Sequence, residues 1–134
     1  MSPYLIRWQF KDATVEALVD KPQNRRTPAE ALIEGFGGKL LSYYFALGEY
    51  DGVGICEFPD TVSVTACSMK AVATGAFARF ETMALLTAEE AKEAMKKAKH
   101  TKIDYSAPNA DPSEVARFFR DHIQARHSGK IVPA

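Results

Sequence analysis

The side chains best suited to chemistry fall on alternating positions of the predicted strands. Alternation places them together on one face of the sheet, the face directed away from the helices. An arginine on such a face can hold a carboxylate, phosphate or enolate through two parallel hydrogen bonds. The six residues are Arg7, Gln9, Tyr44, Glu57, Arg79 and Glu81. They predict either a site for a small organic ligand or a set of ion pairs that fixes the register of an interface between subunits.

A turn with glycine at both rims joins two apolar strands near the middle of the chain, in the order Leu47-Gly48-Glu49-Tyr50-Asp51-Gly52. Glycine adopts positive φ at little cost, and aspartate can accept hydrogen bonds within its own turn. Tyr50 and Asp51 could serve as a proton donor and a base, or Asp51 could fix the turn while Tyr50 covers a hydrophobic edge. Because no third group is positioned beside them, we interpret Gly48, Tyr50 and Asp51 as structural turn residues.

The remaining histidines and cysteines form no recognisable reactive set. His122 and His127 are five residues apart and so lie off any common helix face, and no other pair has the spacing of metal ligands. Cys56 and Cys67 are typical of small buried hydrophobic residues. We therefore predict no metal and no cofactor.

Composition predicts one domain with a substantial core, since 46% of the 134 residues are hydrophobic. Seventeen acidic residues balance seventeen lysines and arginines, so the chain carries no electrostatic signature of nucleic-acid or membrane binding. No apolar run approaches the roughly 20 residues that span a bilayer, and the N-terminus lacks the apolar core of a signal peptide. We expect a cytoplasmic protein.

Strand and helix periodicities predict the order β-α-β-β-α-β. The first strand runs from Tyr4 to Phe10, and its even-numbered residues form an apolar face. The crossover helix that follows is capped by Asp12, is interrupted at Pro22 and restarts with Thr27 as its N-cap. The second strand, over 39–47, is apolar on both faces. Because a strand of this kind is covered on both sides, we predict a homo-oligomer in which another copy covers the face that lacks helices.

The second half of the chain shows the same kinds of signal, namely helix caps and an alternating strand. Asp60 caps a helix that runs to about Thr74, and a strand follows over 77–86. Thr87 and Glu90 form a capping box that opens a further helix to about residue 99. We therefore place one domain over residues 1–100. Residues 101–134 are predicted as a linker and an amphipathic helix over 111–127, containing His122, that docks on its own subunit or on a neighbour.

An ordered set of these features resembles the GYD domain family over roughly residues 3 to 90. The features are the strand Tyr4–Phe10, the Pro22 to Arg25 break, Gly35-Phe36-Gly37-Gly38-Lys39, Leu47-Gly48-Glu49-Tyr50-Asp51, Phe58-Pro59-Asp60, and Thr82 with the Thr87 to Glu90 helix start. The resemblance implies an α+β, ferredoxin-like fold of the dimeric α+β barrel type, with an antiparallel sheet in the order 4-1-3-2. To this the chain adds C-terminal helices. The resemblance also implies a family whose biochemical role is not established.

Two functions follow as hypotheses. The first is a homo-oligomeric module that binds a small molecule, or serves in assembly, through the sheet face. The alternative, by analogy of fold, is a small cofactor-free enzyme of monooxygenase or isomerase type, with a pocket between the sheet and a partner subunit. The absence of an evident nucleophile, base or metal set in the sequence favours the first.

Overall fold

A computed structural model describes residues 1–109, 113 and 120 of the chain. The chain divides into two compact units, Met1–Leu86 and Thr87–Ala134, and the first contains the whole sheet. The predicted helix over 111–127, with His122, lies outside the described residues except at 113 and 120. No helix in the described part of the chain is long and apolar enough to cross a membrane.

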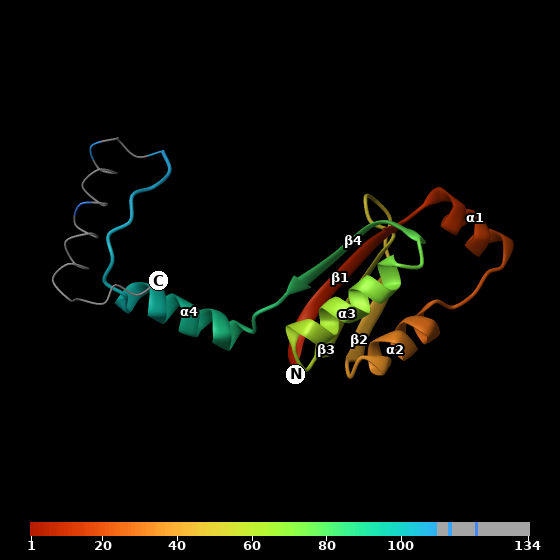
Figure 1. Ribbon diagram of the computed structural model, residues 1–134, viewed down its shortest axis with the longest axis horizontal. Helices are drawn as coiled ribbons and strands as arrows, with labels where there is room; N and C mark the ends of the chain where they lie inside the picture. The colour runs from red at the N-terminus through yellow and green to blue at the C-terminus, as the bar shows by residue number, and fades with distance from the viewer. Residues whose placement is uncertain (110–112, 114–119, 121–134) are drawn as a thin grey trace. The chain divides into compact units, whose positions relative to one another are not determined.

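Four antiparallel strands form the sheet in the spatial order β2-β3-β1-β4 (Figure 1). The central strands are β1 (Ser2–Phe10) and β3 (Gly52–Phe58), and the edge strands are β2 (Lys39–Phe45) and β4 (Phe77–Ala84). This is the predicted order 4-1-3-2 in reverse. The prediction of an α+β, ferredoxin-like sheet is confirmed.

The helices are α1 (Asp12–Asp20), α2 (Arg26–Gly35), α3 (Thr61–Val72) and α4 (Ala88–His100). Helix α2 packs beside β2, and α3 packs across β3 and β4 (Figure 1). Helix α1 contains no buried residue. We call the side of the sheet that carries α2 and α3 the helix face and the opposite side the open face.

Some of the helix caps and breaks predicted from the sequence are present in the structure, and others are not. Asp60 Oδ1 accepts a hydrogen bond from the Ser63 N–H at 2.7 Å, and Thr87 and Glu90 form the predicted capping box. The interruption at Pro22 is also confirmed, because α1 ends at Asp20. The predictions that Asp12 and Thr27 act as N-caps are wrong. Both are already helical, and the residues in the cap positions, Lys11 and Arg25, make no side-chain cap.

The core lies on the helix face, where the even-numbered residues of β1 from Tyr4 to Phe10 are all buried, as their alternation predicts. They pack with Cys56 and Phe58 of β3 and with Val64 and Cys67 of α3. Phe58 is completely buried. Burial of these large side chains holds the two central strands and α3 together.

Strand β2 departs from simple alternation. Leu40 pairs with Cys56, but Ser42 pairs with Ile55, so one extra residue, Leu41, is inserted between them. A bulge of this kind exchanges the faces of all later residues. Alternation over 39–47 predicts that Leu40 and Tyr44 share a face, and this prediction is wrong: Leu40 lies on the helix face and Tyr44 on the open face.

Candidate functional site

The predicted polar residues all lie on the open face, but only some of them are neighbours. The strand register places Tyr44, Val53, Arg7 and Glu81 in one row across the four strands. Gln9 and Arg79 form a pair in the adjacent row. Glu57 stands near the other end of the sheet, where it is paired with Pro3 and Lys39. The row of Leu5, Ile55 and Met83 separates it from Arg7.

Charged groups at the β1–β4 side of the open face pair within the chain. Arg7 Nε donates to Glu81 Oε2 at 2.7 Å, and Arg79 Nη2 lies 3.5 Å from Glu81 Oε1. Arg79 also pairs with Glu49 from the β2–β3 loop. Together with Tyr50, these residues form what we call the arginine–tyrosine cluster.

Tyr50 folds back from the loop over these charges. Its hydroxyl donates to Glu81 Oε1 at 2.5 Å, and its ring centre lies 4.2 Å from the guanidinium carbon of Arg7 and 5.2 Å from that of Arg79. Guanidinium groups are attracted to the face of an aromatic ring. Tyr50 therefore covers charged groups, and the expectation that it covers a hydrophobic edge is wrong. Sequence reasoning missed Tyr50 and Glu49 as members of the polar face.

Hydrogen bonding sets the protonation states in the cluster. The bond between Tyr50 and Glu81 raises the pKa of the Tyr50 phenol and lowers the pKa of the Glu81 carboxyl, and the bond from Arg7 lowers it further. The bond to Glu81 also raises the pKa of Arg7. At neutral pH the phenol is thus a donor and the carboxylate an acceptor, each with its partner in place. This arrangement stabilises the loop and provides no free general base.

Glu81→Gln is expected to lower stability at neutral pH, and the difference from the wild-type protein is expected to shrink as the pH falls below 4.5, the ordinary pKa of glutamate. The folded state depresses the Glu81 pKa, so its carboxylate stabilises the fold above the unfolded pKa. That contribution is lost as the pH falls through the folded pKa. Melting temperatures of both proteins from neutral to acid pH measure the effect. A constant difference across this range would contradict it.

Asp51 connects the loop to β1 by both its side chain and its backbone. Its Oδ2 accepts from the Phe10 N–H at 2.8 Å, and its own N–H donates to the Trp8 carbonyl at 2.8 Å. The loop is closed by the Ala46 N–H, which donates to the Asp51 carbonyl at 2.9 Å. Asp51 thus joins the loop to β1, and its carboxylate bonds to a neighbouring strand and not within its own turn. Gly48 has the positive φ, +137°, that the turn interpretation predicts.

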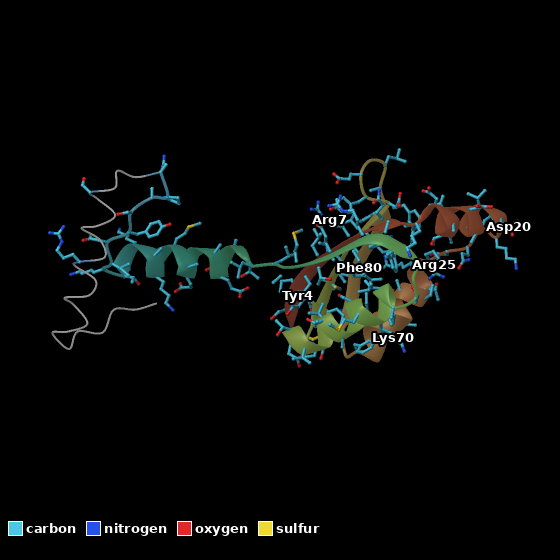
Figure 2. The ribbon with its side chains drawn as sticks, turned by 45° about the horizontal axis from the view of Figure 1, so that its top comes forward. Tyr4, Arg7, Asp20, Arg25, Lys70 and Phe80 are labelled. Atoms are coloured by element: carbon cyan, nitrogen blue, oxygen red, sulfur yellow. The ribbon has the colours of Figure 1, made fainter. Side chains whose placement is uncertain are left out.

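A pocket of about 390 Å³ lies on the helix face of the same sheet. Its floor is formed by apolar and aromatic side chains of the strands, and its walls by α1, α2, α3 and the loop between α1 and α2. Arg25 from that loop and Phe80 from β4 both line it (Figure 2). The other lining residues are Ile6, Trp8, Phe10, Thr14, Ala17, Leu18, Gln23, Pro28, Ala29, Leu32, Ile33, Leu40, Tyr43, Gly54, Cys56, Cys67, Ala71, Thr74, Ala76 and Phe77.

Comparison with known families identifies this sheet and its helices. The profile described as the GYD domain matches residues 4–95. The chain belongs to the GYD domain family. The resemblance drawn from the strand, turn and cap residues is thereby confirmed, and the matched region includes the arginine–tyrosine cluster and every residue of the pocket. A comparison with curated proteins found no match.

The two cysteines of this GYD domain stand in the pocket wall. Both are free and buried, in agreement with the prediction that they are small core residues. Burial raises the pKa of Cys56 to about 12 and that of Cys67 to about 11, so both thiols are protonated at neutral pH. A thiol in this state is a poor nucleophile and a poor metal ligand. Within the described residues, no three His, Cys, Asp or Glu side chains are grouped as metal ligands.

Proposed function

We propose that this GYD domain protein is a homo-oligomeric small-molecule-binding protein, and that its ligand occupies the pocket on the helix face. The observation that carries the proposal is the pocket itself. Its volume of about 390 Å³ falls in the range of roughly 300 to 1,000 Å³ that ligand sites occupy. Apolar walls with a few polar groups are the usual composition of such a site.

The pocket exists because the two pieces of the crossover helix leave part of the sheet uncovered. Helix α1 ends at Asp20 and contributes no buried residue, while α2 buries only Ile33. The half-buried aromatic side chains of Tyr43, Phe77 and Phe80 border the gap. An apolar ligand in this position would remove their exposed surface from water, which favours binding.

The sequence predicts either a ligand site or ion pairs on the open face, and the charges there make a ligand less favourable in that position. A carboxylate bound by Arg7 would have to displace Glu81, and one bound by Arg79 would have to displace Glu49. Each displacement exchanges one ion pair for another and yields little net affinity. The helix-face pocket imposes no such exchange, so it is the better binding site.

The open face instead supports the homo-oligomer. A strip of half-buried or exposed apolar side chains, Leu5, Val53, Ile55 and Met83, crosses its centre. The charged residues of this face are three cations, Arg7, Lys39 and Arg79, and three anions, Glu49, Glu57 and Glu81. Because the two sets balance, a second copy can cover the apolar strip without net charge repulsion.

Ile55→Lys is expected to convert the protein to a monomer, because it places a charge in the middle of this strip. Light scattering should give a mass above 14.8 kDa for the wild-type protein and 14.8 kDa for the variant. Val19→Lys is the matched control: Val19 lies on α1, is 74% exposed and should change nothing. A wild-type particle of 14.8 kDa at micromolar concentration would end the oligomer proposal.

Ala29→Phe is expected to weaken ligand binding tenfold or more, because Ala29 lines the pocket from α2. Trp8, the single tryptophan of the chain, also lines the pocket, so its fluorescence reports occupancy. Decan-1-ol is a suitable uncharged probe for titration. Ala31→Phe, on the same helix but outside the pocket, serves as the control. Equal affinities for the two variants, or no response in the wild-type protein, would refute the pocket as the site.

The alternative of a cofactor-free enzyme has less support from the residues around the pocket. Among the described residues that line it, there is no carboxylate and no histidine, and both thiols are held protonated. The one phenol there, Tyr43, has its pKa raised by burial, and the positive charge of Arg25 opposes this only in part. These groups can donate hydrogen bonds to a ligand more readily than they can remove a proton from it.

A further inference from the structure

Arg25 differs from every other residue that lines the pocket. It is the one charged residue among the described lining residues, and it is half-buried, in the loop that follows the Pro22 break. None of these lining residues is acidic, so the pocket carries a net positive charge at Arg25, and most of its other lining residues are apolar. A site with this distribution of charge is complementary to a ligand with a single anionic group.

The guanidinium of Arg25 is available for such a group. Its Nη1 donates to Gln23 Oε1 at 2.8 Å, and this neutral amide leaves the charge uncompensated. In the described part of the chain no carboxylate forms an ion pair with Arg25, whereas Arg7, Arg26 and Arg79 each pair with a glutamate. A guanidinium has five N–H donors in a planar fork that matches the two oxygens of a carboxylate.

Tyr43 supplies a second donor in the same pocket. Its ring centre lies 5.2 Å from that of Trp8, and both Tyr43 and Arg25 line the pocket. The phenol is protonated at neutral pH and can donate to an anion. Beyond these two groups the floor continues through Phe10, Phe77 and Phe80, whose successive ring centres are 5.4 and 5.1 Å apart. This surface suits a hydrocarbon or aromatic body.

We propose that the pocket selects an amphipathic monoanion, a molecule with one carboxylate and an apolar body, and that Arg25 with Tyr43 holds its head group. This inference rests on the proposed binding function and adds the chemical class of the ligand. It also assigns a specificity role to the interruption between α1 and α2. The break between α1 and α2 places Arg25 at the pocket. A continuous helix would instead carry the chain straight along one axis.

Decanoate and decan-1-ol test the inference, because they share an apolar chain and differ in charge. Each is titrated into the full-length protein while Trp8 fluorescence is followed. We expect decanoate to bind the wild-type protein at least tenfold more tightly than decan-1-ol, a difference of about 1.4 kcal/mol. Arg25→Gln should remove this preference by weakening decanoate alone. Arg26→Gln, which breaks the exposed pair with Glu30, should leave it unchanged.

The outcomes separate the two proposals. Binding of decan-1-ol by Arg25→Gln with the wild-type affinity shows that the variant is folded and that its pocket is intact. If both probes bind the wild-type protein equally, or if Arg25→Gln keeps the preference, the selection of an anion is overturned while the pocket stands. If neither probe binds, the proposed function itself fails. Tyr43→Phe should weaken decanoate several-fold and spare decan-1-ol, and equal loss of both would remove Tyr43 from the head-group site.

Discussion

Gly52→Ala is expected to lower the free energy of unfolding by about 3 kcal/mol, the upper range for overpacking in a core. A Cβ at position 52 would lie 2.2 Å from Trp8 Cζ2 and 2.4 Å from Trp8 Cε2. Trp8 cannot easily withdraw, because it is only 6% exposed and is packed against Tyr43. Gly52 is also paired with Trp8 of β1 and Phe45 of β2, so a backbone shift would disturb both pairings.

Gly35→Ala is the matched control for this experiment. Gly35 is the last residue of α2, and a Cβ added there meets nothing within 4 Å. The substitution should therefore raise stability by about 0.5 to 1 kcal/mol, the usual gain for alanine over glycine in a helix. Urea unfolding of the two variants beside the wild-type protein measures both effects. Equal stabilities of the two variants would contradict the packing argument at Gly52.

The role of Gly52 illustrates what the sequence could and could not predict. Its position beside the turn predicts a rim residue chosen for backbone freedom, whereas in the structure it is a strand residue whose missing side chain makes room for Trp8. The indole Nε1 of Trp8 is enclosed there without a hydrogen-bond partner among the described residues. Such a contact joins residues 44 positions apart, and no local pattern encodes it.

Alternation within strands succeeded where no residue was inserted. It placed the core residues of β1 correctly and put Arg7, Gln9, Arg79 and Glu81 on the open face, because side chains of a strand alternate between faces without exception in a regular ladder. It failed at Leu41, since a single extra residue exchanges the faces and carries no sequence signature here. The faces of a strand can thus be predicted only for residues that no bulge separates.

The candidate sites depend on tertiary structure to different degrees. The pairing of Arg7 with Glu81 follows from strand register, but the return of Tyr50 over them depends on the path of the loop. The helix-face pocket depends on how closely α1 and α2 approach the sheet, a property of packing that periodicity does not measure. The interruption at Pro22 was the one sequence signal near the pocket, and it predicted a break in the helix without indicating the space beside it.

The two proposed roles lie on opposite faces of the sheet, with ligand binding on the helix face and the homo-oligomer interface on the open face. A second copy on the open face would stiffen the sheet that forms the floor of the pocket, and it would lie on the side of the sheet opposite Arg25. On this arrangement Ile55→Lys should change the oligomeric state while decan-1-ol still binds. The pocket and the interface can therefore be tested independently in one set of variants.

Asp51→Ala is expected to lower the free energy of unfolding by about 1 to 2 kcal/mol, because it leaves the Phe10 N–H without its partner. That N–H stands where the β1–β4 register shifts between Gln9 and Phe10, so the bulge has removed its regular strand partner. The carboxylate of Asp51 takes that place and ties the β2–β3 loop to the end of β1. The substitution should accordingly loosen the loop and the end of β1 together.

Asp51→Asn separates hydrogen bonding from charge. Its amide oxygen can still accept from the Phe10 N–H, so the variant should retain more than half of the stability that the alanine variant loses. Denaturant midpoints of the three proteins give the energies, and hydrogen exchange of the Phe10 amide shows whether the bond itself is lost. Faster exchange at Phe10 in Asp51→Ala, with protection kept in Asp51→Asn, is the expected pattern. An unchanged midpoint in Asp51→Ala would mean that other contacts hold the loop, among them the Asp51 N–H bond to Trp8 and the contacts of Tyr50 with Arg7, Arg79 and Glu81.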